Sequence, residues 1–207
     1  MSEAVFPTKS NLIAFKKNLD LARLGFELLD RKRNVLMREM MRLIDEAADL
    51  QRSIGTTFED AYACLQRANV TLGIENNVIS FAPEETGLHL ESRSVMGVDL
   101  PTVTLAPSTP RPYYGFSETN SELDEAYISF EKVKRLTARL AEIDNSVYRL
   151  ALAIQKTQRR ANMLENISIP RFETNVKFIQ DVLDEREREE FTRLKVIKSQ
   201  KEKAAKE

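Results

Sequence analysis

The feature that most constrains this chain is an apolar repeat of about 3.5 residues that begins close to the N-terminus. Counted from residue 12 in alternate steps of three and four, twelve of thirteen positions are apolar. A repeat held over six heptads is typical of a coiled-coil seam, because an ordinary surface helix drifts to a 3.6-residue period and ends sooner. The positions are Leu12, Phe15, Leu19, Ala22, Phe26, Leu29, Arg33, Leu36, Met40, Leu43, Ala47, Leu50 and Ile54.

We therefore predict a first coiled-coil arm over residues 1–72, with its helix beginning where Thr8 can cap free N–H groups. Arg33 is the one charged residue in the seam. It is either a device that fixes helix pairing, or a residue whose stem lies on the seam while the guanidinium reaches water. Gly25 and Gly55 fall within or near the helix, where a bend or a close helix approach would explain either of them.

A second apolar repeat lies in residues 117–198, which we predict to be a second coiled-coil arm. Capping-box patterns at Ser121 and at Thr119 indicate where its helix begins. Pro170 predicts a kink, the irregular spacing beyond it resembles a stutter, and residues 199–207 are expected to fray. The seam positions are Val133, Leu136, Leu140, Ile143, Val147, Leu150, Ile154, Thr157, Ala161 and Leu164, followed by Phe172, Val176, Ile179, Leu183, Phe191 and Leu194.

Helix-breaking residues are concentrated in the middle segment, residues 73–116. It holds nine of the thirteen glycines and prolines, and this distribution argues against α/β enzymes, β-sandwiches and glycine-looped nucleotide folds. We predict short strands at 78–81 and 88–92, and a strand at 98–100 that pairs back across a turn at Met96-Gly97. Beyond this strand we expect four prolines to prevent regular structure: Pro101, Pro107, Pro110 and Pro112.

Two long arms on either side of this segment bury both stripes most simply by folding back on each other. The predicted fold class is all-α dominated: a long antiparallel two-helix coiled coil with a small middle segment that contains a β-hairpin. That segment is expected to form a foot at the end where the chain turns round, while the two termini meet at the other end.

The sequence lacks the usual signatures of catalysis and nucleotide binding. No glycine is followed by lysine, so there is no P-loop, and no GxGxxG pattern occurs. His89 and Cys64 are the only residues of their types, too few for a zinc site, and Cys64 is expected to be a small core residue. A net charge of −1 argues against a nucleic-acid binder. We predict no catalytic, cofactor-binding or metal-binding residues.

Five groups of residues follow one another in order over nearly the whole chain. They are Pro7-Thr-Lys-Ser-Asn-Leu with Leu21-Ala-Arg-Leu-Gly-Phe-Glu-Leu-Leu-Asp-Arg-Lys-Arg33, Arg93-Ser-Val-Met-Gly-Val98, Ser121-Glu-Leu-Asp-Glu-Ala126, Arg159-Arg-Ala-Asn-Met-Leu-Glu165 with Ile169-Pro-Arg171, and Glu185-Arg-Glu-Arg-Glu-Glu-Phe191 leading into Arg193-Leu-Lys. This ordered set resembles the D subunits of V/A-type rotary ATPases. The Pro-rich stretch 104–114 is not covered by the resemblance.

The resemblance implies a non-catalytic central stalk that transmits torque between ATP hydrolysis or synthesis and ion translocation. In that family the paired helix ends enter a ring of catalytic A and B subunits. The foot joins a small F subunit and the funnel-shaped subunit above the membrane rotor ring. Ring contacts are expected at Thr8, Lys9, Lys16, Lys17, Arg186, Arg188, Arg193 and Lys195, and foot contacts at Arg93, Val95 and Met96.

No apolar run approaches the ~20 residues of a membrane helix, and the first ten residues hold no signal-peptide core. The expected location is cytoplasmic and peripheral to the membrane through the complex, without nucleic acid or direct membrane insertion. The alternative function is that of a structural or chaperone-like coiled-coil hairpin, similar to prefoldin, or a tether. Such a chain is expected to oligomerise through its strands and to expose apolar tips, whereas the tips predicted here are charged.

Overall fold

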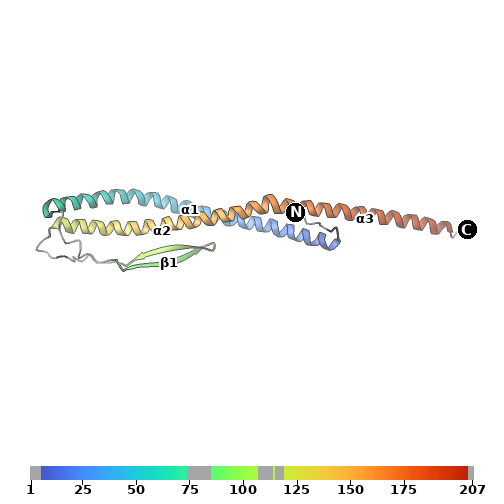
Figure 1. Cartoon of the computed structure of the whole chain (residues 1–207), viewed down its shortest axis with the longest axis horizontal. Helices are drawn as coiled ribbons and strands as arrows, with labels where there is room; N and C mark the ends of the chain where they lie inside the picture. The colour runs from blue at the N-terminus through green and yellow to red at the C-terminus, as the bar shows by residue number, and fades with distance from the viewer. Residues whose placement is uncertain (1–5, 74–84, 107–113, 115–118, 205–207) are drawn as a thin grey trace. The chain divides into compact units, whose positions relative to one another are not determined.

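The computed structural model describes residues 6–73, 85–106, 114 and 119–204, with side chains described as far as residue 201. In these residues the elements are α1 Lys9–Leu72, β1 Leu88–Val95, β2 Val98–Leu105, α2 Ser121–Met163, the π-helical segment η2 Leu164–Ser168 and α3 Ile169–Ala204 (Figure 1). Long helices with one small antiparallel hairpin confirm the predicted fold class. The chain divides into unit 1, Met1–Arg33 with Lys156–Glu207, and unit 2, Asn34–Gln155, each of which is described by itself.

The helix ends follow from local capping. Thr8 caps α1 as predicted, since its Oγ1 accepts a hydrogen bond from the Asn11 N–H at 3.2 Å. At the other end of α1, Gly73 has φ +83° and donates its N–H to the Asn69 carbonyl at 3.0 Å, a conformation that glycine adopts without strain. Of the two predicted capping boxes at the start of α2, the one at Ser121 was wrong. Asn120 caps the helix, with its Oδ1 accepting a hydrogen bond from the Leu123 N–H at 3.0 Å.

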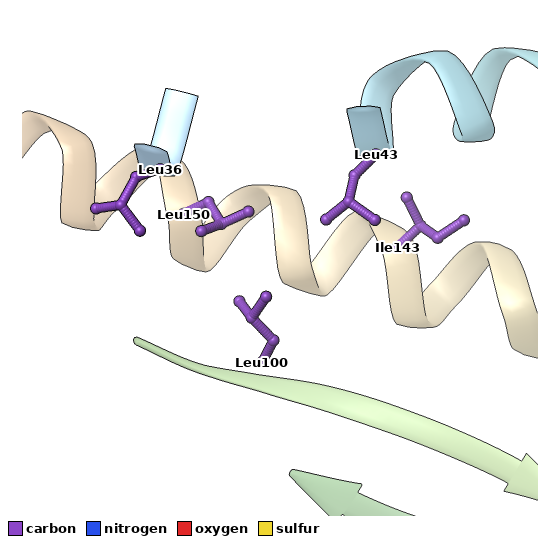
Figure 2. Close-up of a cluster of buried hydrophobic side chains, with 5 residues drawn as sticks. All are labelled: Leu36, Leu43, Leu100, Ile143 and Leu150. Carbon is purple, nitrogen blue, oxygen red and sulfur yellow. The ribbon is translucent and has the colours of Figure 1, made fainter. Parts of the chain in front are cut away.

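The core of unit 2 lies where α1, α2 and β2 meet. Figure 2 shows Leu36 and Leu43 from α1 facing Ile143 and Leu150 from α2, with Leu100 reaching toward them from β2. The four helical residues of this cluster are positions of the two predicted seams. Burial of each such side chain contributes roughly 1.5–3 kcal/mol, so the cluster is the main attachment between the hairpin and the helices.

Farther along α1, the seam of unit 2 continues through small side chains. Ala61, Cys64 and Ala68 are buried at the same three-and-four spacing, and Ala126 is buried on α2. The prediction that Cys64 is a small core residue is confirmed. Because small residues give a weak hydrophobic signal, the apolar repeat seemed to end near Ile54 in the sequence, although the buried stripe does not.

The hairpin turns at Met96-Gly97, as predicted. Both residues have positive φ, +50° and +76°, which is typical of the type I′ turn that joins two strands through two residues. The strands are longer than predicted, and they pair in register from Val95↔Val98 to Leu88↔Leu105. The strand predicted at 78–81 lies outside the described residues, as do Pro107, Pro110 and Pro112.

Pro101 was wrongly expected to end regular structure, because it lies inside β2 opposite Ser92. The two-residue turn makes Val95 and Val98 a hydrogen-bonded pair, and the alternation along the ribbon then makes Ser92 and Pro101 a non-bonded pair. The nitrogen of Pro101 therefore points away from β1, and no ladder hydrogen bond is lost.

The hairpin also lies in a different place from the one predicted. Instead of forming a foot where the chain turns round, it folds back beside α2 (Figure 1). Val95 and Val98, which flank the turn, pack against the Leu36 and Leu150 cluster. The Leu100 side chain completes that cluster and accounts for this position.

The two helical segments of unit 1 form a simpler pair. Leu19 and Ala22 on α1 and Val176 and Ile179 on α3 are buried, and the rings of Phe15 and Phe172 lie 6.1 Å apart. The apolar stripe predicted for the second arm is not buried as far as its last residues. Phe191 and Leu194 are exposed, because α1 begins at Lys9, which pairs with Glu187, and α3 continues beyond that point.

The Arg33 guanidinium does not reach out to water, contrary to one of the two interpretations. Its guanidinium lies against the opposite helix and donates to the Gln158 Oε1 at 2.7 Å, and it forms an ion pair with Asp30 at 2.5 Å. About a quarter of the side chain is exposed. The polar seam position is therefore used for a contact between helices, which favours the pairing interpretation.

The π-helical segment η2 accounts for the irregular spacing that resembled a stutter. Steps of four and three from Leu164 would pass through residues 171, 175 and 178, whereas the buried stripe follows Phe172, Val176 and Ile179, one residue later each time. A π turn holds one residue more than an α turn and absorbs this shift. The Ile169 N–H accordingly bonds the Leu164 carbonyl, five residues back. The kink predicted at Pro170 stays a prediction.

The two helical glycines differ in their surroundings. A Cβ built on Gly25 would lie 3.6 Å from the Leu164 Cδ1, which is an ordinary contact, and one built on Gly55 would meet nothing within 4 Å. Neither glycine is therefore required by a close approach of helices.

Candidate functional site

The predicted contact surface at the helix ends belongs to unit 1. Lys9 Nζ lies 3.0 Å from the Glu187 carboxylate, and Arg186 donates to the Pro7 carbonyl at 3.3 Å. The hydrogen bond that Lys9 donates to Glu187, together with the charge of that carboxylate, raises the pKa of Lys9. These contacts bring the start of α1 beside the charged part of α3.

The other residues predicted for this surface are exposed but are not all brought together. Arg188 and Arg193 form ion pairs within α3, with Glu185 at 3.4 Å and Glu189 at 3.5 Å. Lys16 and Lys17 follow Phe15, whose ring lies against Phe172, and Phe172 precedes Arg186 by fourteen residues on α3. In an antiparallel pair each step forward on one helix is a step backward on the other.

The residues predicted for the foot lie at the turn end of the hairpin in unit 2. Arg93 donates to the Glu39 carboxylate at 2.8 Å, and Val95 is half-buried against the core. Met96 has about half of its surface exposed. The Arg93 side chain is equally exposed but is held by its ion pair with Glu39, whereas Met96 lies at the turn itself.

The outer edge of β2 is covered by α2. The alternation along the ribbon directs the backbone groups of residues 99, 101 and 103 away from β1. Arg149 donates to the Asp99 carbonyl at 3.0 Å, and the Val103 N–H donates to the Glu142 carboxylate at 3.0 Å. Between these two bonds, the Ser146 hydroxyl lies 3.5 Å from the Pro101 carbonyl.

Ion pairs between charged side chains link the two helices in the same region. Arg42 binds Glu39 at 2.9 Å and Glu46 at 3.4 Å, while Arg139 binds Glu46 at 2.6 Å and Glu142 at 2.5 Å. The Arg42 guanidinium, helped by Arg93, lowers the pKa of the Glu39 carboxyl. The hydrogen bond that Arg139 donates to Glu46 is the main cause that raises the pKa of Arg139.

The profile of the ATP synthase D-subunit family matches residues 11–199. The D subunit of a V-type ATP synthase from Thermotoga neapolitana is 47% identical over 197 residues, which cover 94% of this chain and 97% of that protein. The D subunits of the A-type ATP synthases from Pyrococcus horikoshii and Thermococcus kodakarensis are 38% and 37% identical, over 93% and 94% of this chain and 92% and 94% of their own lengths. The chain belongs to the ATP synthase D-subunit family.

Family membership agrees with the resemblance found in the ordered sequence groups, and it does not favour the prefoldin-like alternative. In the part of the chain that the structure describes, no helix is long and apolar enough to cross a membrane. No group of three or more His, Cys, Asp or Glu side chains is placed to hold a metal ion in those residues.

Sequence reasoning missed the contacts that hold the hairpin. Carboxylates on a long helix usually face solvent, yet Glu142 is 8% exposed and Ser146 3% exposed because β2 covers them. Their spacing carried a usable signal. Glu142, Ser146 and Arg149 recur at four and three residues, which places them on one face of α2. A polar face of this kind fits the edge of a strand.

Proposed function

We propose that this chain is the central rotor shaft of a V/A-type ATPase or ATP synthase, a non-catalytic subunit that transmits torque between the catalytic head and the ion-translocating membrane ring. Family membership carries the proposal. The architecture supports it, since α1 runs unbroken for 64 residues and is paired with the C-terminal helices in each unit. A stiff helix pair is what transmission of a rotation requires.

The proposed partners are the catalytic A and B subunits at the helix ends of unit 1, and the F subunit and the funnel-shaped subunit at the hairpin. The location that follows is the cytoplasmic face of the membrane, reached through the complex. All described α3 residues from Asp184 onward are exposed, and many are charged. Exposed ion pairs are individually weak, at about 0–1 kcal/mol, so such a surface can exchange partners as the shaft turns.

Deletion of residues 184–207 tests the proposal in the reconstituted complex. We expect the truncated chain to assemble with its partners while ATP-driven rotation and ion transport fall severalfold or more. The matched control is the full-length chain with Lys156 and Lys177 replaced by glutamine, because these exposed residues lie in the same unit and are not among the predicted ring contacts. Full coupling after the deletion would contradict the rotor assignment.

Hairpin contacts require a separate comparison. Met96→Ser is expected to weaken binding of the F or funnel-shaped subunit, as measured by affinity pull-down. Leu90→Ser provides the control, since Leu90 is exposed on the same hairpin but lies away from the turn. Equal binding by the wild type and both variants would remove Met96 from the proposed interface.

A further inference from the structure

One network of alternating charges connects all four elements of unit 2. Its members, in order of contact, are Arg93, Glu39, Arg42, Glu46, Arg139, Glu142 and the Val103 N–H. We call this set the alternating network. Three arginines alternate with three glutamates, so the network is neutral as a whole and every neighbour carries the opposite charge.

The two ends of the network lie on the hairpin, and its centre lies on the helices. Arg93 belongs to β1, Val103 to β2, and the carboxylates between them to α1 and α2. At the centre are two arginines, Arg42 and Arg139, each of which pairs with two carboxylates. Arg42 bridges two carboxylates on α1, and Arg139 joins Glu46 on α1 to Glu142 on α2. Neither of these arginines forms a described hydrogen bond with a strand.

Because Glu142 is buried, its hydrogen bond with Val103 is sensitive to its ion pair with Arg139. Glu142 is 8% exposed and carries its negative charge between the Arg139 guanidinium and the Val103 N–H. A buried carboxylate that loses its cation is costly, because little water remains to solvate it. The carboxylate geometry that holds β2 therefore depends on Arg139, and through it on Glu46 of the opposite helix.

We propose that the alternating network couples the docking of the hairpin to the alignment of α1 against α2, so that a slide or twist of the helix pair loosens or tightens the hairpin. A shift of α1 along α2 changes the distance between Glu46 and Arg139, and Arg139 cannot follow Glu46 without leaving Glu142. The same shift moves Glu39 relative to β1. The hairpin is thereby sensitive to helix alignment at both strands. This property belongs to the chain itself and is independent of the proposed rotor function.

Hydrogen–deuterium exchange of the full chain, resolved to individual amides, tests the coupling. The Val103 amide is the reporter. Arg139→Met removes the central cation but keeps an apolar stem of similar reach, and exchange at Val103 should rise by about tenfold, which corresponds to about 1.4 kcal/mol in local opening. The helix amides of α1 and α2 should keep wild-type protection.

The matched control is Arg52→Met, because Arg52 bonds Asp49 and the Ala48 carbonyl within α1. It should leave exchange at Val103 unchanged. If Arg139→Met also raises exchange at the helix amides, Arg139→Lys becomes the test of the coupling. Lysine keeps the charge but lacks the planar guanidinium that reaches two carboxylates. A smaller rise at Val103 in that variant supports the proposal, and wild-type exchange overturns it.

A double variant distinguishes one coupled network from two independent attachments of the hairpin. Arg42→Met should also accelerate exchange at Val103, although three ion pairs and one hydrogen bond separate Arg42 from that amide. The double variant with Arg139→Met should exchange no faster than the faster single variant, because both changes break one connected network. Multiplied effects in the double variant, or no effect of Arg42→Met, would overturn the coupling.

Discussion

Units 1 and 2 build on the same kind of helix pair but differ in what covers it. In unit 1 two helical segments face each other and bury one stripe, with Ala161 and Ile179 almost fully enclosed. Unit 2 adds the hairpin, so that Leu36 and Leu150 are closed in by a third element. The added layer also buries Glu142, a polar side chain that would face solvent on an uncovered pair. A third element thus changes which residue types the same helix geometry can bury.

The largest expected effect is the loss of a core side chain where three elements meet. Leu150→Ala should lower the free energy of unfolding by about 2–5 kcal/mol, because the surrounding side chains on α1, α2 and β2 cannot all collapse into the cavity. Leu29→Ala, at a half-buried seam position of unit 1, should cost less. Urea unfolding followed by circular dichroism measures both. Leu152→Ala is the exposed control on α2. Equal losses for Leu150→Ala and Leu29→Ala would abolish the distinction between the units.

The turn of the hairpin provides the next test. Gly97→Ala should destabilise the hairpin by about 1–2 kcal/mol, because a side chain at φ +76° is strained. The same substitution at Gly55 should instead stabilise α1 by up to about 1 kcal/mol, since alanine is the better helix former and a Cβ there meets nothing within 4 Å. Exchange rates of the β2 amides and the thermal midpoint report the two effects. A stabilising Gly97→Ala would be incompatible with the turn described.

Acid should weaken unit 2 through Glu39. Its folded-state pKa is lowered by Arg42 and Arg93, so its stabilisation is fully present above the ordinary value of 4.5 and is lost as the pH falls through the folded-state pKa. The contribution is expected to be about 1 kcal/mol, because the carboxylate is only partly buried. Urea midpoints between pH 6 and pH 3 should fall less steeply in Glu39→Gln than in the wild type. Identical slopes would show that Glu39 makes no such contribution.

The smallest effect is expected at the exposed ion pairs of unit 1. Arg23 lies 2.6 Å from the Glu173 carboxylate, but about half of each side chain is exposed. Arg23→Met should change the free energy of unfolding by only a few tenths of a kcal/mol, and raising the salt concentration should shrink the difference further. A loss of more than about 1 kcal/mol at low salt would mean that unit 1 depends on charge contacts as strongly as unit 2.

The sequence predicted much of the helix pairing, because long apolar side chains at a regular spacing report directly on a buried stripe. Leu36, Leu43, Ile143 and Leu150 were all identified in this way and are buried. The Met96-Gly97 turn was predictable for a similar local reason. Packing of the hairpin along α2 was not predicted. The spacing of Glu142, Ser146 and Arg149 indicates a shared polar face, but the backbone atoms of β2 that this face binds cannot be identified from residue types.

The sequence also did not predict how much of the C-terminal end of α3 is exposed. Phe191 and Leu194 continue the apolar spacing, and only the position where α1 begins determines that nothing on α1 faces them. A residue pattern describes one helix at a time, whereas burial depends on the length of its partner. The ring and foot residues remain predictions for the same reason, because their partners are other chains.

The π-helical segment makes the number of residues between Leu164 and Ser168 as important as their identities. Deletion of a single residue there would remove the extra residue that the π turn absorbs, and an unbroken α-helix would still keep Phe172, Val176 and Ile179 on the seam. Insertion of one more residue, without a further π turn, would instead rotate everything after it by about 100°, the angle of one residue in an α-helix. The same three side chains would then leave the seam together, although none of them had been changed. At this place the direction of a change in length decides its effect on the fold.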